Sequence, residues 1–169
     1  MLMDNDLAAL RAEVLGAFGT AQRPPEFQIA PHACERCAQL SADLAGVEWT
    51  AMPDGLIEEY PSGLSLLSPE AYAYFLPGYV LYALAHFTRD AIASEMTVYN
   101  LAFNEPTNED VADWQRERLK FITGDQLDVL IRFLHRVEAA PEFGGRIGRE
   151  EVAAARARLQ HFWAERWTV

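Results

Sequence analysis

The stretch from Ser68 to Phe87, SPEAYAYFLPGYVLYALAHF, constrains the fold of this chain more than any other part of its sequence. Its first residues are typical of a helix N-terminus. The Ser68 hydroxyl can cap free N–H groups, Pro69 suits the first helical position, and the Glu70 carboxylate is favourable near the positive end of the helix dipole. From Ala71 onward it contains no Asp, Glu, Lys or Arg. A helix that is apolar on all sides is buried on most of them. The sequence therefore predicts a central core helix over residues 68–87.

The same stretch must also be considered as a membrane span. A span needs about 20 apolar residues, with about 17 as the lower limit. The uncharged run sits at that limit, carries Pro77-Gly78 in its middle, and has its tyrosines spread along it rather than gathered at two interfaces. We expect no membrane association, and a core helix that Pro77 kinks or divides. The buried phenol groups then need hydrogen-bond partners.

Composition limits the kinds of partner this chain can have. Its 169 residues, half of them apolar, are enough for one globular domain over 1–169. The net charge is −11, and Lys120 is the single lysine. An acidic chain repels phosphate backbones, so we expect no nucleic-acid partner. The acidic surface can serve solubility alone, which we place first, or it can attract a basic partner protein.

The N-terminal residues MLMDNDLAALRAEVL carry acids where a signal peptide carries basic residues, and they include no long apolar core. We therefore expect a cytoplasmic protein. The chain has two cysteines, and in a reducing compartment we expect them not to form a structural disulfide.

Helical spacing of apolar residues predicts an all-α fold with roughly six or seven helices around the central one. A first helix is expected over Leu7–Phe18 and a second over about 33–45, ended by Gly46. Thr123 and Gln126 form a capping box that opens a later helix. The other expected helices cover Ile92–Phe103, Val111–Phe121 and Val152–Trp163, the last with Arg149 and Arg156 facing outward in i, i+4 pairs.

Residues 47–67 show no helical period and contain Pro53, Gly55, Pro61 and Gly63. Val47 and Trp49 alternate as in a short strand, and Asp54-Gly55 is a turn signal. We expect a long structured loop with a small hairpin. A loop of this length in a globular domain is often functional.

The segment His32-Ala33-Cys34-Glu35-Arg36-Cys37 is the strongest candidate for chemistry. Cys34 and Cys37 have the spacing that holds one zinc ion, and His32 can supply a third ligand. A closed structural zinc site needs a fourth ligand, for which His86, His135, His161 or a carboxylate is available.

Two other interpretations of this segment stay open. A helix start favours the thiolate, and Cys-x-x-Cys is the usual spacing of a redox dithiol. However, no strand–helix–strand unit of the thioredoxin type is evident in the sequence. The cysteines can also be small buried hydrophobes, with Cys37, Leu40 and Leu44 forming an inward helical stripe.

Other catalytic patterns are weak. The glycine-rich stretch Phe143–Gly148 lacks the preceding strand and the lysine of a phosphate-binding loop. Glu58 and Glu59 are interpreted as solvated carboxylates rather than an acid/base pair. His86 is the one ionisable group in the apolar stretch, and we expect a hydrogen-bonded core histidine there.

Several stretches together resemble a known family. They are Ala17-Phe18, the His-x-Cys-x-x-Cys segment, Trp49, Leu64–Val80 (LSLLSPEAYAYFLPGYV) and Thr123–Leu134 (TGDQLDVLIRFL). The match covers roughly residues 7–137 and resembles small, mostly bacterial proteins catalogued as a domain of unknown function. The resemblance implies that Cys34, Cys37 and Pro77 belong to a shared pattern, and it implies no activity.

The sequence as a whole favours a non-enzymatic domain that binds a partner protein, with His32, Cys34 and Cys37 as the candidate ligands of a structural zinc ion. The alternative is a thiol- or metal-dependent enzyme that uses Cys34 and Cys37. The sequence assigns no catalytic residue and no oligomeric state.

Overall fold

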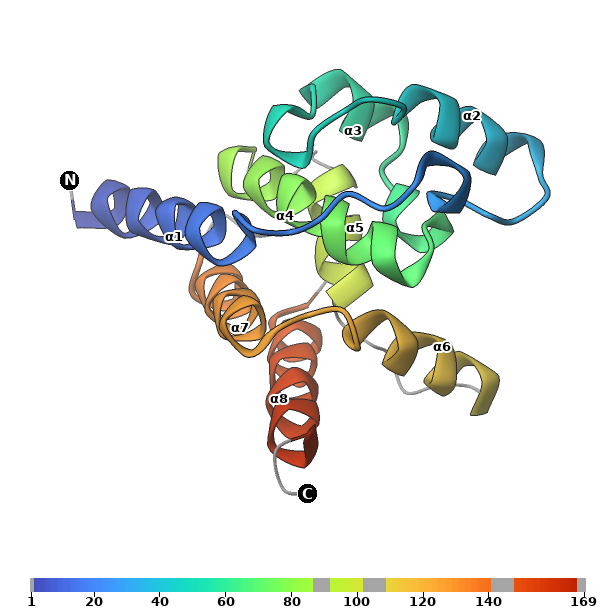
Figure 1. Ribbon diagram of the computed structural model, residues 1–169. Coiled ribbons are helices and arrows are strands. Elements are labelled where there is room, and N and C mark those ends of the chain that lie inside the picture. Colours follow the sequence, from blue (N-terminus) through green and yellow to red (C-terminus); the bar gives the residue numbers. More distant parts are fainter. Residues whose placement is uncertain (1, 87–91, 102–108, 141–147, 167–169) are drawn as a thin grey trace.

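The computed structural model describes residues 2–86, 92–101, 109–140 and 148–166, which form helices and connecting turns (Figure 1). No β-strand occurs in these ranges, so the predicted all-α class is confirmed. They contain eight α-helices and three short 3₁₀ turns. In chain order these are α1 (Leu2–Phe18), η1 (Glu26–Gln28), α2 (Glu35–Asp43), η2 (Trp49–Ala51), α3 (Asp54–Glu59), η3 (Gly63–Leu66), α4 (Pro69–Ala85), α5 (Ile92–Leu101), α6 (Glu109–Leu119), α7 (Gly124–Ala139) and α8 (Arg149–Arg166).

The helix α4 is the predicted central helix, and α1, α5, α6, η2 and η3 pack against it (Figure 1). Every residue from Ala71 to Val80 is buried. The Ser68 hydroxyl accepts a hydrogen bond from the Ala71 N–H at 3.1 Å, which caps the helix as predicted. The helix continues across Pro77, so the proline does not divide it. None of the described helices is long and apolar enough to cross a membrane.

The four phenol groups of α4 all donate hydrogen bonds, as their burial requires. The pairs are Tyr72 to the Asn100 carbonyl (3.1 Å), Tyr74 to the Glu48 carboxylate, Tyr79 to the Tyr60 carbonyl (3.0 Å) and Tyr82 to Glu58 Oε1 (3.0 Å). Burial raises the pKa of Tyr72, Tyr74 and Tyr82 to about 12, so these phenols remain protonated donors at neutral pH. The four bonds link α4 to Glu48 before η2, to the C-terminal end of α3 twice, and to α5.

Residues 47–67 form three short helical pieces, η2, α3 and η3, and the expected hairpin is absent from this fully described segment. Asp54-Gly55, which resembled a turn, is the start of α3 after Pro53, whose extended backbone precedes the helix. Trp49 is buried in η2 and its ring meets the Phe18 ring edge-on, with ring centroids 6.4 Å apart. The pattern at Val47 and Trp49 therefore reflects a tryptophan buried against α1, not strand pairing.

The turn η2 lies directly against α4 at Gly78. A Cβ atom at this position would lie 2.5 Å from Met52 Sδ and 2.9 Å from the Trp49 carbonyl oxygen. Real Cβ atoms essentially never approach other atoms so closely. Glycine is therefore required here by the close approach of two backbones.

The buried faces of α5 and α6 differ from those that apolar spacing predicted. In α5, Ile92 is 55% exposed and the smaller Ala93 and Thr97 are buried, because small side chains let α5 pack closely on α4. Phe103 lies outside the described residues. In α6, Trp114 is 42% exposed and Arg118 is buried in its place.

The predicted capping box at the start of α7 is confirmed. The Thr123 hydroxyl accepts from the Gln126 N–H at 3.4 Å, and the Thr123 N–H donates to Gln126 Oε1 at 2.9 Å. In α8, Val152 and Leu159 are buried as predicted, whereas the side chain of Trp163 lies outside the described residues.

Arg156 forms an ion pair with a residue of another helix, so the predicted i, i+4 partner within α8 was wrong. Arg156 Nε lies 3.0 Å from Glu138 Oε2 of α7, and both side chains are partly buried. The pair joins two packed helices instead of forming an i, i+4 pair on a solvated face.

Replacing Gly78 with alanine should destabilise the protein by about 1–3 kcal/mol, because the added methyl group must push η2 away from α4. Gly16 in α1 has no atom within 4 Å of an added Cβ and is the matched control. Gly16→Ala should be neutral or stabilise by roughly 0.5–1 kcal/mol, as expected of an unhindered helical glycine. Urea unfolding of both variants measures the difference, and equal stability would contradict the close approach.

Candidate metal centre

The His-x-Cys-x-x-Cys segment forms the N-terminal end of α2. Cys34 is the N-cap residue, with an extended backbone and a sulfur atom that accepts a hydrogen bond from the Cys37 N–H at 3.3 Å. The Cys34 N–H in turn donates to the His32 carbonyl at 2.9 Å. Cysteine thus takes the place of the usual Ser, Thr, Asp or Asn cap, and its sulfur faces the positive end of a helix. The helix is shorter than predicted: it ends at Asp43 with Leu44 as its C-cap, and Gly46, with a φ of 71°, lies in the turn that follows.

The three candidate ligands lie together. Cys34 Sγ and Cys37 Sγ are 3.0 Å apart and both cysteines are free thiols. One ligand atom from each of His32, Cys34 and Cys37 lies within 4.8 Å of the others. His32 is exposed, Cys34 is half-buried and Cys37 is buried, so the group extends from the surface into the core.

The two thiols differ strongly in acidity. The hydrogen bond that Cys37 donates to Cys34 lowers the pKa of Cys34 to about 7, and a hydrogen bond with His32 acts in the same direction. The bond to Cys34, together with burial, raises the pKa of Cys37 to about 11. At neutral pH the pair therefore consists of a partly ionised, accessible Cys34 and a protonated, buried Cys37.

The start of α2 is attached firmly to the rest of the structure. Arg36 donates to the Glu59 carbonyl at 2.7 Å, and its guanidinium lies over the Tyr60 ring, 4.3 Å from the centroid. On the other side, Ile29 is buried and its carbonyl accepts from the Ser68 N–H at 2.9 Å. The segment with the candidate ligands is thus held on one side by Glu59 of α3 and on the other by Ser68, the N-cap residue of α4.

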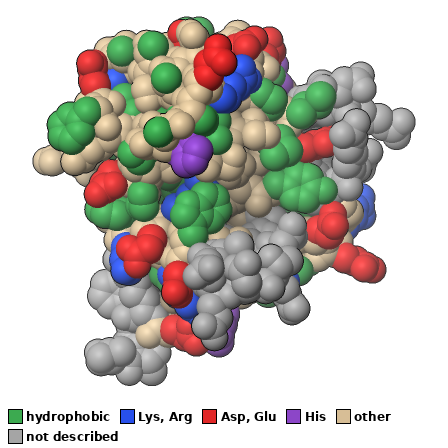
Figure 2. Space-filling view, turned by 90° about the vertical axis from the view of Figure 1, so that its right-hand side faces the viewer, with side chains coloured by type: hydrophobic (Ala, Val, Ile, Leu, Met, Phe, Trp, Pro, Cys, Tyr) green, Lys and Arg blue, Asp and Glu red, His purple; other side chains and the backbone are tan. Residues whose placement is uncertain are grey.

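A groove of about 390 Å³ opens beside the group. His32 and Cys37 form part of its wall. The other lining residues are Pro31, Ser65, Leu66, Leu67, Ser68, Pro69 and Trp114. Figure 2 looks onto the side that carries α6 and the start of α2, and there a histidine side chain lies among exposed hydrophobic side chains. The groove therefore offers an apolar setting next to the candidate ligand atoms.

The far wall of the groove is braced by a buried arginine. Arg118, only 1% exposed, has its guanidinium 3.4 Å from the Trp114 ring centroid and 4.6 Å from that of Tyr72. It donates to the Leu64 carbonyl at 2.7 Å, and it forms no ion pair within the described part of the chain. Burial lowers the pKa of Arg118 to about 10, which leaves it charged at neutral pH. Sequence reasoning missed this stack, although the i, i+4 spacing of Trp114 and Arg118 on one helix was a readable signal.

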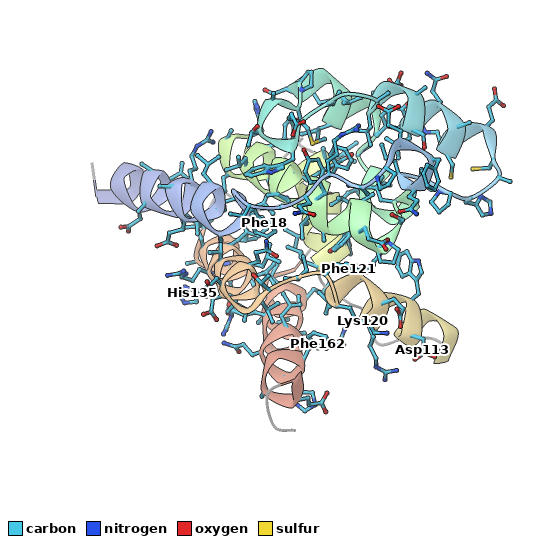
Figure 3. All side chains as sticks on the ribbon, in the orientation of Figure 1. Phe18, Asp113, Lys120, Phe121, His135 and Phe162 are labelled. Carbon is cyan, nitrogen blue, oxygen red and sulfur yellow. The ribbon has the colours of Figure 1, made fainter. Side chains whose placement is uncertain are left out.

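The expected fourth ligands do not join the group. Within the described ranges, no His, Cys, Asp or Glu besides the three belongs to it. His86 instead ends α4, partly exposed, with Nε2 2.8 Å from Asp54 Oδ2, so it is hydrogen-bonded but not a core residue. Exposed His135 lies on the outer side of α7 (Figure 3), and His161 is 3.1 Å from Glu165.

The remaining sequence candidates have other places in the structure. Glu58 accepts from Tyr82, and Glu59 pairs with Arg36 at 3.4 Å. They therefore bind different partners and do not form an acid/base pair. Most of the glycine-rich stretch 143–148 lies outside the described residues.

Comparisons with known proteins identify a family for this chain but no characterised relative. The model of a family of unknown function, DUF6714, matches residues 17–167. No curated protein and no solved structure matches the chain.

In metal-free protein at pH 7, iodoacetamide should alkylate Cys34 much faster than Cys37, because the lower pKa of Cys34 gives it far more thiolate. The rate at Cys34 should rise through pH about 7. Cys37→Ala should move that rise to higher pH by removing the hydrogen-bond donor, whereas His135→Ala should leave it in place. Peptide mass spectrometry against time gives both rates. Equal rates at the two cysteines would contradict the assigned asymmetry.

Proposed function

The chain belongs to the family DUF6714, a family of unknown function, and we propose from its geometry that it is a metal-binding domain whose His32, Cys34 and Cys37 hold one zinc ion. The observation that carries the proposal is that the three ligand atoms lie within 4.8 Å of one another. Two thiolates and an imidazole form a donor set that zinc prefers.

The geometry needs only a small adjustment to accept the ion. Zinc–sulfur bonds of about 2.3 Å at a tetrahedral angle place the two sulfurs about 3.8 Å apart. The Cys34 and Cys37 sulfurs are 3.0 Å apart, so they separate by less than an ångström. The Cys37 proton that now bridges them is lost to solvent, because the thiolate is the ligand.

The bound metal would have a structural effect. It would join the residues before α2 to the first turn of that helix, whose Cys37 and Leu40 are buried in the core. Because such a site forms only in the folded chain, its binding free energy adds to the stability of the fold.

We further propose that this domain acts by binding a protein partner. The net charge of −11 supports a basic partner. The exposed aromatic rings of Phe27, Trp114 and Phe121 support an interface, since aromatic side chains are enriched at binding surfaces. We take residues 1–169 as a single domain for this purpose, and the packing of α1 on α7 supports that choice.

A second candidate function is thiol–disulfide exchange, favoured by the 3.0 Å separation of the two sulfurs at a helix start. The Cys34 thiolate would attack a substrate disulfide, form a mixed disulfide and release one substrate thiolate. The Cys37 sulfur, after losing its proton to solvent, would attack Cys34 Sγ and release the second substrate thiolate. The substrate disulfide is reduced by two electrons, and the protein retains a Cys34–Cys37 disulfide.

Protein purified without chelator should contain one zinc per chain, and a chelator should lower its melting temperature. At a zinc concentration of 100 times Kd the stabilisation is about 2.7 kcal/mol, or roughly 5–10 °C for a chain of this size. Cys34→Ser with Cys37→Ser should lose both the metal and the chelator effect, whereas His135→Ala should keep both. Metal analysis and thermal unfolding measure these outcomes.

A chain that binds no zinc and melts identically with and without chelator would contradict the metal proposal. Reversible formation of the Cys34–Cys37 disulfide in a glutathione redox buffer would then support the exchange function. If neither occurs, both candidate functions fail.

A further inference from the structure

We infer that the proposed zinc ion takes its fourth ligand from the groove beside it, and that this ligand is a neutral aromatic nitrogen donor such as an imidazole ring. The inference rests on the proposed zinc site and specifies what that site binds. It connects the His32–Cys34–Cys37 group with the adjacent groove, whose wall includes Trp114. A structural metal ion alone would not require such a groove.

The first step concerns the number of ligands. Zinc in proteins is almost always tetrahedral, and sites with three protein ligands use the fourth position for water or substrate. Within the described ranges the group has three members. His32 is exposed and Cys34 half-buried, so a ligand from outside can approach the ion. The arrangement is that of an exchangeable site and not of a closed one.

The second step concerns the surroundings of the fourth position. His32 and Cys37 line the groove, so a ligand on the metal would extend into it. The hydroxyls of Ser65 and Ser68 are already hydrogen-bonded, to the Ser62 carbonyl and the Ala71 N–H. The rest of the wall is mainly leucine, proline and tryptophan. The groove therefore fits an apolar or aromatic body better than a polar one.

The third step concerns charge. A zinc ion with two thiolates and a neutral imidazole has no net charge. None of the lining residues is Asp, Glu, Lys or Arg. An anionic fourth ligand would add a negative charge that no lining side chain compensates, to a protein whose net charge is already −11. A neutral nitrogen donor avoids that cost and is a good ligand for zinc.

The fourth step concerns the Trp114 ring. Arg118 holds one face of the indole at 3.4 Å and is itself fixed by its 2.7 Å hydrogen bond to the Leu64 carbonyl. The ring is thus oriented before any ligand arrives, yet it is 42% exposed on the groove wall. An aromatic ligand on the metal can pack against it, which an aliphatic donor does less well.

The test uses full-length protein loaded with Co²⁺, whose visible absorption reports both thiolate ligation and changes in the fourth ligand. Imidazole should change the spectrum saturably while the metal stays bound through gel filtration. Trp114→Ala should bind Co²⁺ normally but weaken the imidazole affinity by about three- to tenfold, the loss expected for one aromatic contact. Phe121→Ala is the matched control, because Phe121 is 46% exposed and lines a different cavity.

Two further arms identify the source and the chemistry of the ligand. The peptide acetyl-Leu-His-Leu-amide, compared with its alanine analogue, represents a histidine side chain, whereas imidazole represents a free small molecule. Tighter binding of either one supports the aromatic nitrogen class and assigns its source. Tighter binding of 2-mercaptoethanol than of imidazole would overturn that class.

The outcomes separate the two proposals. Absence of any thiolate–cobalt absorption would contradict the zinc site itself. Normal Co²⁺ binding with a spectrum that no added ligand changes would leave the zinc site standing and overturn the exchangeable position. Equal loss of imidazole affinity in Trp114→Ala and Phe121→Ala would overturn the role of the groove.

Discussion

The burial of α4 on all sides is the constraint on which the rest of the structure depends. From Ala71 onward this helix carries no charged residue and gains most by full burial, but its tyrosines carry hydroxyl groups that need acceptors once they leave water. The fold meets this need from three directions, with carboxylates of Glu48 and Glu58 and carbonyls of Tyr60 and Asn100. The segment 47–67 and α5 are therefore bound to α4 by polar as well as apolar contacts.

The start of α4 also connects the core to the candidate metal centre. Ser68 caps α4 with its side chain, and its N–H donates a hydrogen bond to the Ile29 carbonyl, just before the candidate metal-binding segment. The next residue, Pro69, lines the same groove as His32 and Cys37. A local helix cap thus fixes one wall of the groove, while the stack of Trp114 on Arg118 fixes another. A site at the surface gains rigidity in this way from the most buried helix of the protein.

The two candidate functions depend on the same two thiols and on their protonation. Both use the same pair, in which Cys34 is partly ionised and Cys37 holds a proton. A zinc ion would displace that proton and keep the sulfurs apart, whereas oxidation would join them in a disulfide that no longer offers thiolate ligands. The two proposed functions would therefore exclude each other on this segment, because a disulfide between Cys34 and Cys37 leaves no thiolate for a metal ion.

The sequence by itself determined the features that depend on near neighbours: the Ser68 cap, the Thr123 capping box and the cysteine pair, whose members are one helical turn apart. Only the tertiary structure decided which faces of α5 and α6 are buried, how 47–67 folds, and that a groove ends beside the cysteines. Those features depend on contacts between distant residues, such as Arg118 with the Leu64 carbonyl. Apolar spacing alone did not identify the buried faces of these two helices. The helix α5 buries the small side chains of Ala93 and Thr97, and α6 buries the cation of Arg118.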